Sequence, residues 1–252
     1  MYTTIHLFGR TFSSYWTVFA VGCLVMALIN CLRRKKMSFS CPQAIIHTLL
    51  MILFSLLGAK ILYALENWKT FVENGITLNG VSFFGSCFCL PLGVYLICKK
   101  KKISFEAYLD YCTPSLIVML AILRFACWCN GCCGGITYST GAYTTAVVPT
   151  QIIECIGDLV ILLVILIVEW HYSGKGLSYP YFLVLYGILR FFLEFVRDTP
   201  KDWLYLSHGQ WFSLVSVAAG GYFLYRIMKE ILKEGREKKK KRLASQSHKK
   251  RK

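Results

Sequence analysis

Three ionisable residues with helical spacing stand at the end of a hydrophobic stretch, residues 177–196 and the position just after it. Arg190, Glu194 and Arg197 are separated by four and three residues, which predicts that they share one face of a helix. Arginine forks donate two parallel, charge-assisted hydrogen bonds to a phosphate, and Glu194 would orient both guanidiniums. The spacing predicts a phosphate-binding face. The alternative is that these charges only pair with one another and hold helices together.

Two further hydrophobic stretches carry ionisable residues. Arg124 lies near the end of the stretch 111–129, and Glu154 follows Gln151 near the start of the stretch 148–168. Charged side chains inside a membrane are costly, so they usually face a cavity or a partner. We therefore expect one cavity to collect these groups, with an anionic lipid headgroup as its ligand.

The segment 124-RFACWCNGCCGG-135 carries four cysteines, Cys127, Cys129, Cys132 and Cys133. Its glycines allow a sharp turn and a close approach of the backbone to a ligand. The thiols could bind a metal, form a disulfide on the exported side, act as a nucleophile or lipid carrier, or simply line a pocket. Adjacent Cys132 and Cys133 make a poor pair for one ion, and no histidine or second cysteine pair lies nearby. We therefore expect no metal site.

The elements that must position these residues are transmembrane helices. Of the 252 residues, 56% are hydrophobic and 17% are charged, and the apolar residues fall in blocks of about 20, the length that spans a bilayer. The chain is expected to be an all-α membrane protein with one seven-span domain, residues 1–228, and a disordered basic tail, residues 229–252. The spans are expected near residues 14–32, 43–65, 80–98, 111–129, 148–168, 177–196 and 210–228.

Basic residues predict the orientation. The segments 33–36, 99–102 and 171–176 and the tail after residue 228 hold most of the 29 Lys and Arg. By the positive-inside rule the N-terminus lies outside and the C-terminus is cytoplasmic. The candidate site then faces the outer leaflet, where a phospholipid could place its phosphate on the arginines. The net charge of +16 is explained by these segments and by a tail near anionic headgroups, so the expected partner is the bilayer and not a nucleic acid.

At these residues the sequence resembles the bacterial prolipoprotein diacylglyceryl transferase family, over most of the chain except the tail. The family signature G-R-x-G-N-F-x-N-G-E-x-x-G reads L-R-F-A-C-W-C-N-G-C-C-G-G here, and the pattern Y-G-x-x-R-x-x-x-E-x-x-R runs from Tyr186 to Arg197. The segment H-P-[ST]-Q-x-Y-E appears as 148-VPTQIIE-154, slgQwlS as 207-SHGQWFS-213, and G-[GA]-R-x-x-Y as 58-GAKILY-63. The first-span tyrosine is Tyr15.

The resemblance implies a plasma-membrane enzyme that needs no cofactor. It would move the diacylglyceryl group of phosphatidylglycerol to the lipobox cysteine of a prolipoprotein and release glycerol phosphate. It would also bind the signal peptide of that prolipoprotein. Arg124, Arg190 and Glu194 would be catalytic. The residues that would bind the substrate are Tyr15, Gly85, Asn130, Gly131, Gly135, Gln151, Glu154 and Arg197.

Departures from the family pattern bear on the reaction. The motif S-F-H-G-G, whose histidine is a proposed base, reads S-F-F-G-S with Phe84 in its place, and Cys127 and Cys132 replace an asparagine and a glutamate. A thiol with a free pKa of about 8.5 still has to lose its proton. His208, before the last predicted span, is the candidate substitute base. The alternatives are a diverged paralogue with another acceptor and a non-catalytic lipid-binding protein.

Overall fold

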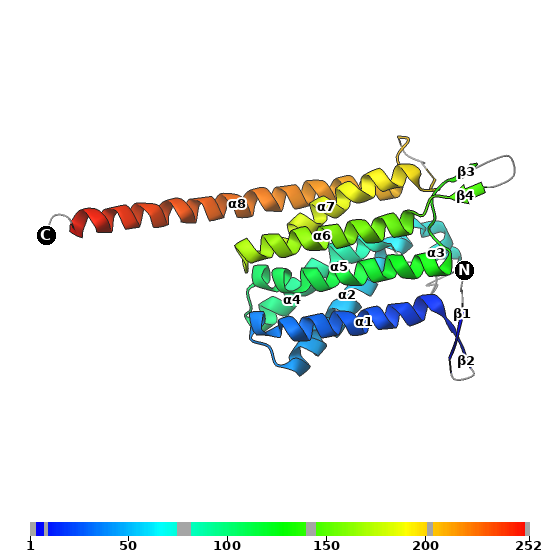
Figure 1. Ribbon diagram of the computed structural model, residues 1–252, viewed down its shortest axis with the longest axis horizontal. Helices are drawn as coiled ribbons and strands as arrows, with labels where there is room; N and C mark the ends of the chain where they lie inside the picture. The colour runs from blue at the N-terminus through cyan, green and yellow to red at the C-terminus, as the bar shows by residue number, and fades with distance from the viewer. Residues whose placement is uncertain (1–3, 8–9, 75–81, 140–144, 201–203, 250–252) are drawn as a thin grey trace.

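A computed structural model of the chain describes residues 4–7, 10–74, 82–139, 145–200 and 204–249 (Figure 1). It is a bundle of long helices with two short antiparallel hairpins. The helices are α1 (Ser14–Arg33), α2 (Cys41–Glu66), α3 (Trp68–Asn74), α4 (Phe83–Lys101), α5 (Phe105–Asn130), α6 (Thr150–Tyr172), α7 (Ser178–Leu193) and α8 (His208–Lys249), with 3₁₀ turns η1 (Arg34–Met37) and η2 (Glu194–Val196). The hairpins pair β1 (Thr4–Leu7) with β2 (Arg10–Ser13) and β3 (Thr137–Ser139) with β4 (Thr145–Val147).

Local sequence signals set several helix ends. Ser40 and Gln43 form a reciprocal capping box at the start of α2, and the Ser104 hydroxyl accepts a hydrogen bond from the Ala107 amide at the start of α5. Gly131 ends α5 in the left-handed conformation, with φ of 72°. The segment that carries the cysteines therefore begins at a defined stop.

Six helices are long and apolar enough to cross a membrane: α1 with η1, α2, α4, α5, α6, and α7 with η2. They coincide with the first six predicted spans, and large apolar side chains remain exposed on their outer surfaces. The all-α membrane fold is therefore confirmed. The seventh predicted span, residues 210–228, lies in α8, which is not among these six helices. Its first half packs on α7, where the Ser216 hydroxyl donates to the carbonyl of Leu183 at 3.0 Å.

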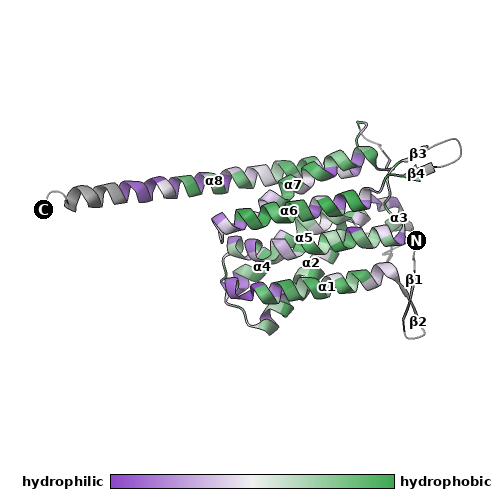
Figure 2. Cartoon of the chain, in the orientation of Figure 1, coloured by the Kyte–Doolittle hydropathy of each residue, from purple (hydrophilic) through white to green (hydrophobic). Residues whose placement is uncertain are grey.

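The end of the chain differs from the expected disordered tail, because α8 continues as a helix to Lys249. Its outer half projects beyond the bundle and is hydrophilic (Figure 2). Lysine and glutamate are good helix formers, and oppositely charged pairs four residues apart, such as Glu234 and Lys238, add support. Glu234 also pairs with Lys175, with 2.8 Å between nitrogen and oxygen.

Glycines allow close helix contacts. A Cβ on Gly85 of α4 would lie 2.2 Å from the carbonyl oxygen of Gly58 in α2. Such small-residue contacts are typical of membrane helix pairs. Gly85 was expected to approach a ligand, but the structure shows it packed against a neighbouring helix.

Polar contacts join the helices at the end from which α8 projects, where hydrophilic residues gather (Figure 2). Glu169 pairs with Arg33 and with Lys36, the latter at 2.7 Å. Asp110 accepts hydrogen bonds from the backbone amides of Gly176 and Ser178, both at 2.9 Å. These groups hold α1, α5, α6 and the start of α7 together.

Candidate functional site

Glu154 is the centre of a buried ion-pair network at the opposite end of the bundle. It lies one turn into α6 and is fully buried. Arg124 Nε of α5 lies 2.9 Å from its Oε1, and Arg190 Nη1 of α7 lies 2.9 Å from its Oε2. Arg197 Nη1, just after η2, lies 3.8 Å from the same Oε2. Three arginines from two helices and a loop therefore converge on one carboxylate.

The hydroxyl of Tyr186 joins two members of this network. It donates to Glu154 Oε1 at 2.7 Å and accepts from Arg124 Nη2 at 3.3 Å. Tyr186 is buried in α7 one turn before Arg190. We assigned it no role from the sequence, although it begins the late family pattern. Its match to that pattern was the sequence signal that could have identified it.

Glu194 contacts the two arginines that the sequence predicted. Its Oε2 lies 3.1 Å from Arg190 Nη2 and 3.8 Å from Arg197 Nε, so it contacts both guanidiniums, but Glu154 contacts all three. Thr199 donates to its Oε1 at 2.8 Å. The prediction of one α-helical face was wrong, because α7 ends at residue 193 and Arg197 is extended, with φ −90° and ψ 147°.

The network carries one net positive charge, since three guanidiniums face the carboxylates of Glu154 and Glu194. Asp158, one turn deeper in α6, is fully buried, and neither of its carboxyl oxygens has a hydrogen-bond partner among the described residues. Burying an unpaired carboxylate is costly, so the neutral acid is favoured and adds no charge.

The turn after α5 is tied to both α6 and α7. The amide of Gly135 donates to the carbonyl of Val148 at 2.9 Å, and the amide of Ile136 donates to the carbonyl of Val196 at 2.9 Å. Gly135 also forms a β-bridge with Arg197. A Cβ on Gly135 would lie 2.4 Å from the carbonyl oxygen of Val196, so only glycine allows this approach. The turn therefore fixes the backbone that carries Arg197.

The first residues of α6 fasten the same turn. Thr150 Oγ1 donates to the carbonyl of Cys133 at 3.0 Å, and Gln151 Nε2 donates to that of Cys132 at 2.6 Å. Gln151, which was expected to bind substrate, therefore holds the cysteine segment. Gly131, expected in the same role, supplies the helix stop.

The thiols of Cys127, Cys132 and Cys133 lie together, with all three sulfur atoms within 4.8 Å of one another, while Cys129 is outside this group. All twelve cysteines are free thiols. Cys133 is exposed and adopts a left-handed conformation, with φ of 63°, which is unusual for a residue with a Cβ. A hydrogen bond from the Cys127 thiol, with the charges of Arg197 and Arg124, lowers the pKa of Cys133 to about 5.

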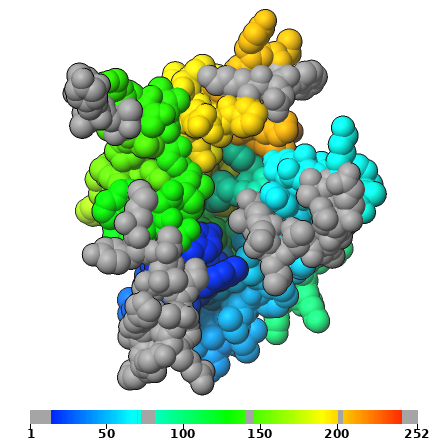
Figure 3. Space-filling model, turned by 90° about the vertical axis from the view of Figure 1, so that its right-hand side faces the viewer, coloured from blue at the N-terminus to red at the C-terminus, as the bar shows by residue number. Residues whose placement is uncertain are grey.

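A cavity of about 530 Å³ lies among α1, α2, α4, α5 and α7. Its walls are mainly apolar, and Tyr15, Arg124, Asn130, Cys127 and Cys133 line it where the elements meet the loops. The surface at this end is hollowed between the segments coloured green, yellow and cyan (Figure 3). The network thus reaches an apolar chamber through Arg124. Tyr15 and Asn130, which were expected to bind the substrate, line the same chamber.

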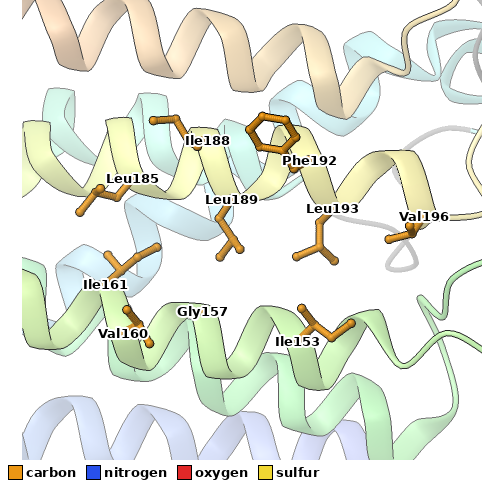
Figure 4. Close-up of a pocket in the computed structure, with 10 residues that line it drawn as sticks. All are labelled: Ile153, Gly157, Val160, Ile161, Leu185, Ile188, Leu189, Phe192, Leu193 and Val196. Carbon is orange, nitrogen blue, oxygen red and sulfur yellow. The ribbon is translucent and has the colours of Figure 1, made fainter.

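A second depression of about 590 Å³ lies between α6 and α7 (Figure 4). Every residue that lines it is apolar, including Ile153, Leu189 and Phe192. Its chemistry suits an acyl chain and provides nothing for a headgroup.

The two positions linked to the missing histidine have partners of their own. Phe84 is buried against Phe88, Phe212 and Tyr186. His208 is exposed at the start of α8 and interacts electrostatically with Glu66 at the end of α2. Among the residues that the structure describes as lining the cavity, His208 is not included.

The chain is similar to known proteins over most of its length. Residues 3–226 match the family described as prolipoprotein diacylglyceryl transferase. A phosphatidylglycerol–prolipoprotein diacylglyceryl transferase 2 of Clostridium perfringens is 28% identical over 239 residues, covering 88% of this chain and 93% of its own length. A phosphatidylglycerol–prolipoprotein diacylglyceryl transferase of Clostridium tetani is 26% identical over 88% of this chain and 95% of its own. One from Finegoldia magna is 27% identical, over 90% and 96%.

Proposed function

The chain belongs to the prolipoprotein diacylglyceryl transferase family, and on that basis we propose that it transfers the diacylglyceryl group of phosphatidylglycerol to the lipobox cysteine of prolipoproteins. The observation that carries the proposal is the convergence of Arg124, Arg190 and Arg197 on Glu154 beside an apolar cavity. A phospholipid needs both halves of this site: cations for its phosphate and an apolar chamber for its chains.

The cations of the network suit the ligand. A phosphatidylglycerol phosphodiester carries one negative charge, and three guanidiniums lie together in the network. Arg124 both lines the cavity and belongs to the network, so it is the residue that would meet the phosphate first. Asn130 and Tyr15, which line the same cavity, would bind the polar part of the lipid. The apolar walls would hold acyl chains.

The chemistry is displacement at carbon. The acceptor thiolate forms a C–S bond to the glycerol carbon, the C–O bond to phosphate breaks, and the electron pair leaves with glycerol phosphate. Negative charge develops on the phosphate oxygens as this bond breaks. The fixed guanidiniums would stabilise that charge without reorganising, because Glu154 and Glu194 already hold them in place. Arg124 and Arg190 are the proposed catalytic residues, and Glu194 positions Arg190.

The proposed setting is the plasma membrane, with the site toward the outer leaflet and the signal peptide of the prolipoprotein as a second ligand. The basic segments, including η1 and the outer half of α8, lie at the end of the bundle away from the network, which supports a cytoplasmic C-terminus (Figure 2). Residues 210–228 of α8 would be the seventh span, with the N-terminus outside.

Reconstitution tests this proposal. The purified chain, in vesicles that contain phosphatidylglycerol, should convert a prolipoprotein to a diacylglyceryl form that shifts on a gel, and it should rescue a strain depleted of its own transferase. Arg124→Ala should abolish the shift, while the exposed Arg226→Ala should not. A well-expressed wild-type protein that neither lipidates the precursor nor rescues the strain would refute the proposal.

A further inference from the structure

Three thiols converge at the wall of the lipid cavity. Cys127 comes from the last turn of α5, and Cys132 and Cys133 come from the turn that follows. Their sulfur atoms all lie within 4.8 Å of one another. The burial is graded, since Cys127 is buried, Cys132 is half-buried and Cys133 is exposed, so the cluster is accessible from one side.

The backbone holds these thiols in place. Gly131 turns the chain at the end of α5, and the left-handed conformation of Cys133 brings two adjacent side chains toward Cys127. The hydrogen bonds from Thr150 and Gln151 fix the carbonyls of Cys133 and Cys132. A strained backbone that its surroundings hold firmly is a common feature of functional sites.

The spacing is close to that of a three-thiolate metal site. With a zinc–sulfur distance of about 2.3 Å, the sulfur atoms of a tetrahedral site lie about 3.8 Å apart, so small side-chain rotations would close the observed triangle. We propose that Cys127, Cys132 and Cys133 bind a thiophilic divalent cation such as Zn²⁺, and that the ion offers its fourth coordination position to the acceptor thiol.

Nearby charge favours this assignment. Three thiolates and a divalent cation together carry one negative charge. Arg197 and Arg124 lie close enough to act electrostatically on Cys133, so they would compensate that charge. The objection raised by the sequence, that adjacent Cys132 and Cys133 cannot serve one ion, does not hold, because Cys127 completes the triangle and the turn aims both thiols toward it.

The fourth coordination position of the ion would activate the acceptor thiol, an inference that rests on the proposed transferase function. Cys127 and Cys133 line the cavity, so an ion on them would border the space assigned to the lipid. Among the described residues that line this cavity there is no His, Asp, Glu or Lys to take the proton of the acceptor thiol. Metal coordination would remove this proton instead, because a thiol that coordinates a metal ion is deprotonated outright.

The resulting step balances. The acceptor thiol binds the ion and releases its proton to solvent. The sulfur lone pair then forms the C–S bond to the glycerol carbon, while the C–O bond to phosphate breaks and its electron pair leaves with glycerol phosphate. The thioether product is neutral and a weaker ligand, so it leaves the ion. No oxidant or further reactant is needed.

Cobalt substitution tests the site directly. Full-length protein in detergent, reduced and then freed of reductant, should bind one Co²⁺ per chain and show the visible absorption of a tetrahedral cobalt–thiolate centre. Cys127→Ser, Cys132→Ser and Cys133→Ser should each weaken binding and change this spectrum. Cys129→Ser is the matched control and should leave it unchanged, since Cys129 lies outside the cluster. Thermal melts check that all four variants are folded.

The fourth position is tested with a lipobox peptide. Its cysteine form should shift the cobalt spectrum as a fourth sulfur binds, and its serine form should not. The proposed metal site would be overturned if the cobalt spectrum did not depend on these three cysteines. It would also be overturned if the protein as isolated contained a disulfide among them. If the cobalt spectrum does not change when the cysteine peptide is added, the ion does not bind the acceptor thiol.

Lipidation assays separate this inference from the proposed function. Treatment with a chelator should suppress lipidation by at least tenfold and added Zn²⁺ should restore it, while Arg190→Ala should keep the cobalt spectrum but lose lipidation. Lipidation that a chelator leaves unchanged would overturn the role of the ion in thiol activation and leave the transferase function standing. Cobalt binding without lipidation by the wild-type chain would refute the transferase function and leave the metal site standing.

Discussion

Arg124 and Glu154 pair across the interface of α5 and α6, with 2.9 Å between Nε and Oε1. The Glu154 side chain is buried and that of Arg124 is 12% exposed, and the pair lies at the junction of the ion network and the cavity. A buried ion pair repays the cost of removing two charges from water only when further hydrogen bonds satisfy the remaining groups. Tyr186 and Arg190 provide them here. The pair is therefore maintained by the whole network.

Replacing Glu154 should disrupt this network most. Glu154→Gln would leave three guanidiniums with one carboxylate between them, and breaking a buried pair costs about 3–5 kcal/mol. We expect lipidation to fall by at least a hundredfold and the melting temperature to drop. Both are measured on purified protein in detergent. Asp158→Asn is the matched control, because the described structure gives its carboxyl no hydrogen-bond partner. Equal losses in the two variants would contradict the central role of Glu154.

The hydroxyl of Tyr186 should matter for activity more than for folding. Tyr186→Phe keeps the ring but removes the hydrogen bond to Glu154 and the acceptor for Arg124. Hydrogen bonds to charged groups contribute about 1.5–3 kcal/mol, so kcat/KM should fall by roughly ten- to a hundredfold. The exposed Tyr222→Phe should be silent. An unchanged kcat/KM for Tyr186→Phe would show that the hydroxyl does not position Arg124.

The bridge from Gly135 to Arg197 should not tolerate a side chain. In Gly135→Ala the new Cβ would meet the carbonyl of Val196 at 2.4 Å, so the turn and the segment after η2 would separate. We expect Arg197 to be displaced and the KM for phosphatidylglycerol to rise by about tenfold or more. Gly221→Ala, whose Cβ would meet nothing within 4 Å, is the control. Equal KM values in the two variants would argue against this bridge.

Metal-free protein should show an acidic thiol at Cys133, with a pKa lowered to about 5 by the Cys127 hydrogen bond and by Arg197 and Arg124. A lowered thiol pKa means that the thiolate already predominates at neutral pH. Alkylation of Cys133 by iodoacetamide should therefore change little between pH 6.5 and 8.5, while that of a free cysteine with a pKa of about 8.5 rises roughly fiftyfold. Mass spectrometry of the modified peptide gives the rate.

Removing the hydrogen-bond donor provides the control. Cys127→Ala should raise the pKa of Cys133 and restore a steeper pH dependence. If alkylation of Cys133 in the wild-type protein rises with pH as steeply as free cysteine, the assigned electrostatics are wrong.

Much of the fold was determined by the sequence itself. Apolar runs of span length identify six of the helices directly, because a helix is the form in which a single segment satisfies its backbone in lipid. The helix of the tail was missed, since its charge was read as disorder and its helix formers were given too little weight. The charged residues of the ion network, including Arg124, Glu154 and Arg190, were also recognisable, because ions are rare within spans.

Only the tertiary structure decided which partners these residues have. Sequence spacing describes neighbours along one helix, so it predicted the contacts of Glu194 with Arg190 and Arg197. It did not predict that Glu154 reaches both arginines from another helix. Gly85 was expected to approach a ligand, whereas its contact is with Gly58, which lies 27 positions earlier in the chain. Adjacent Cys132 and Cys133 join Cys127 through a left-handed turn that no spacing rule predicts. The sequence determines which side chains are present at each position. The packing of the helices determines which of them are in contact.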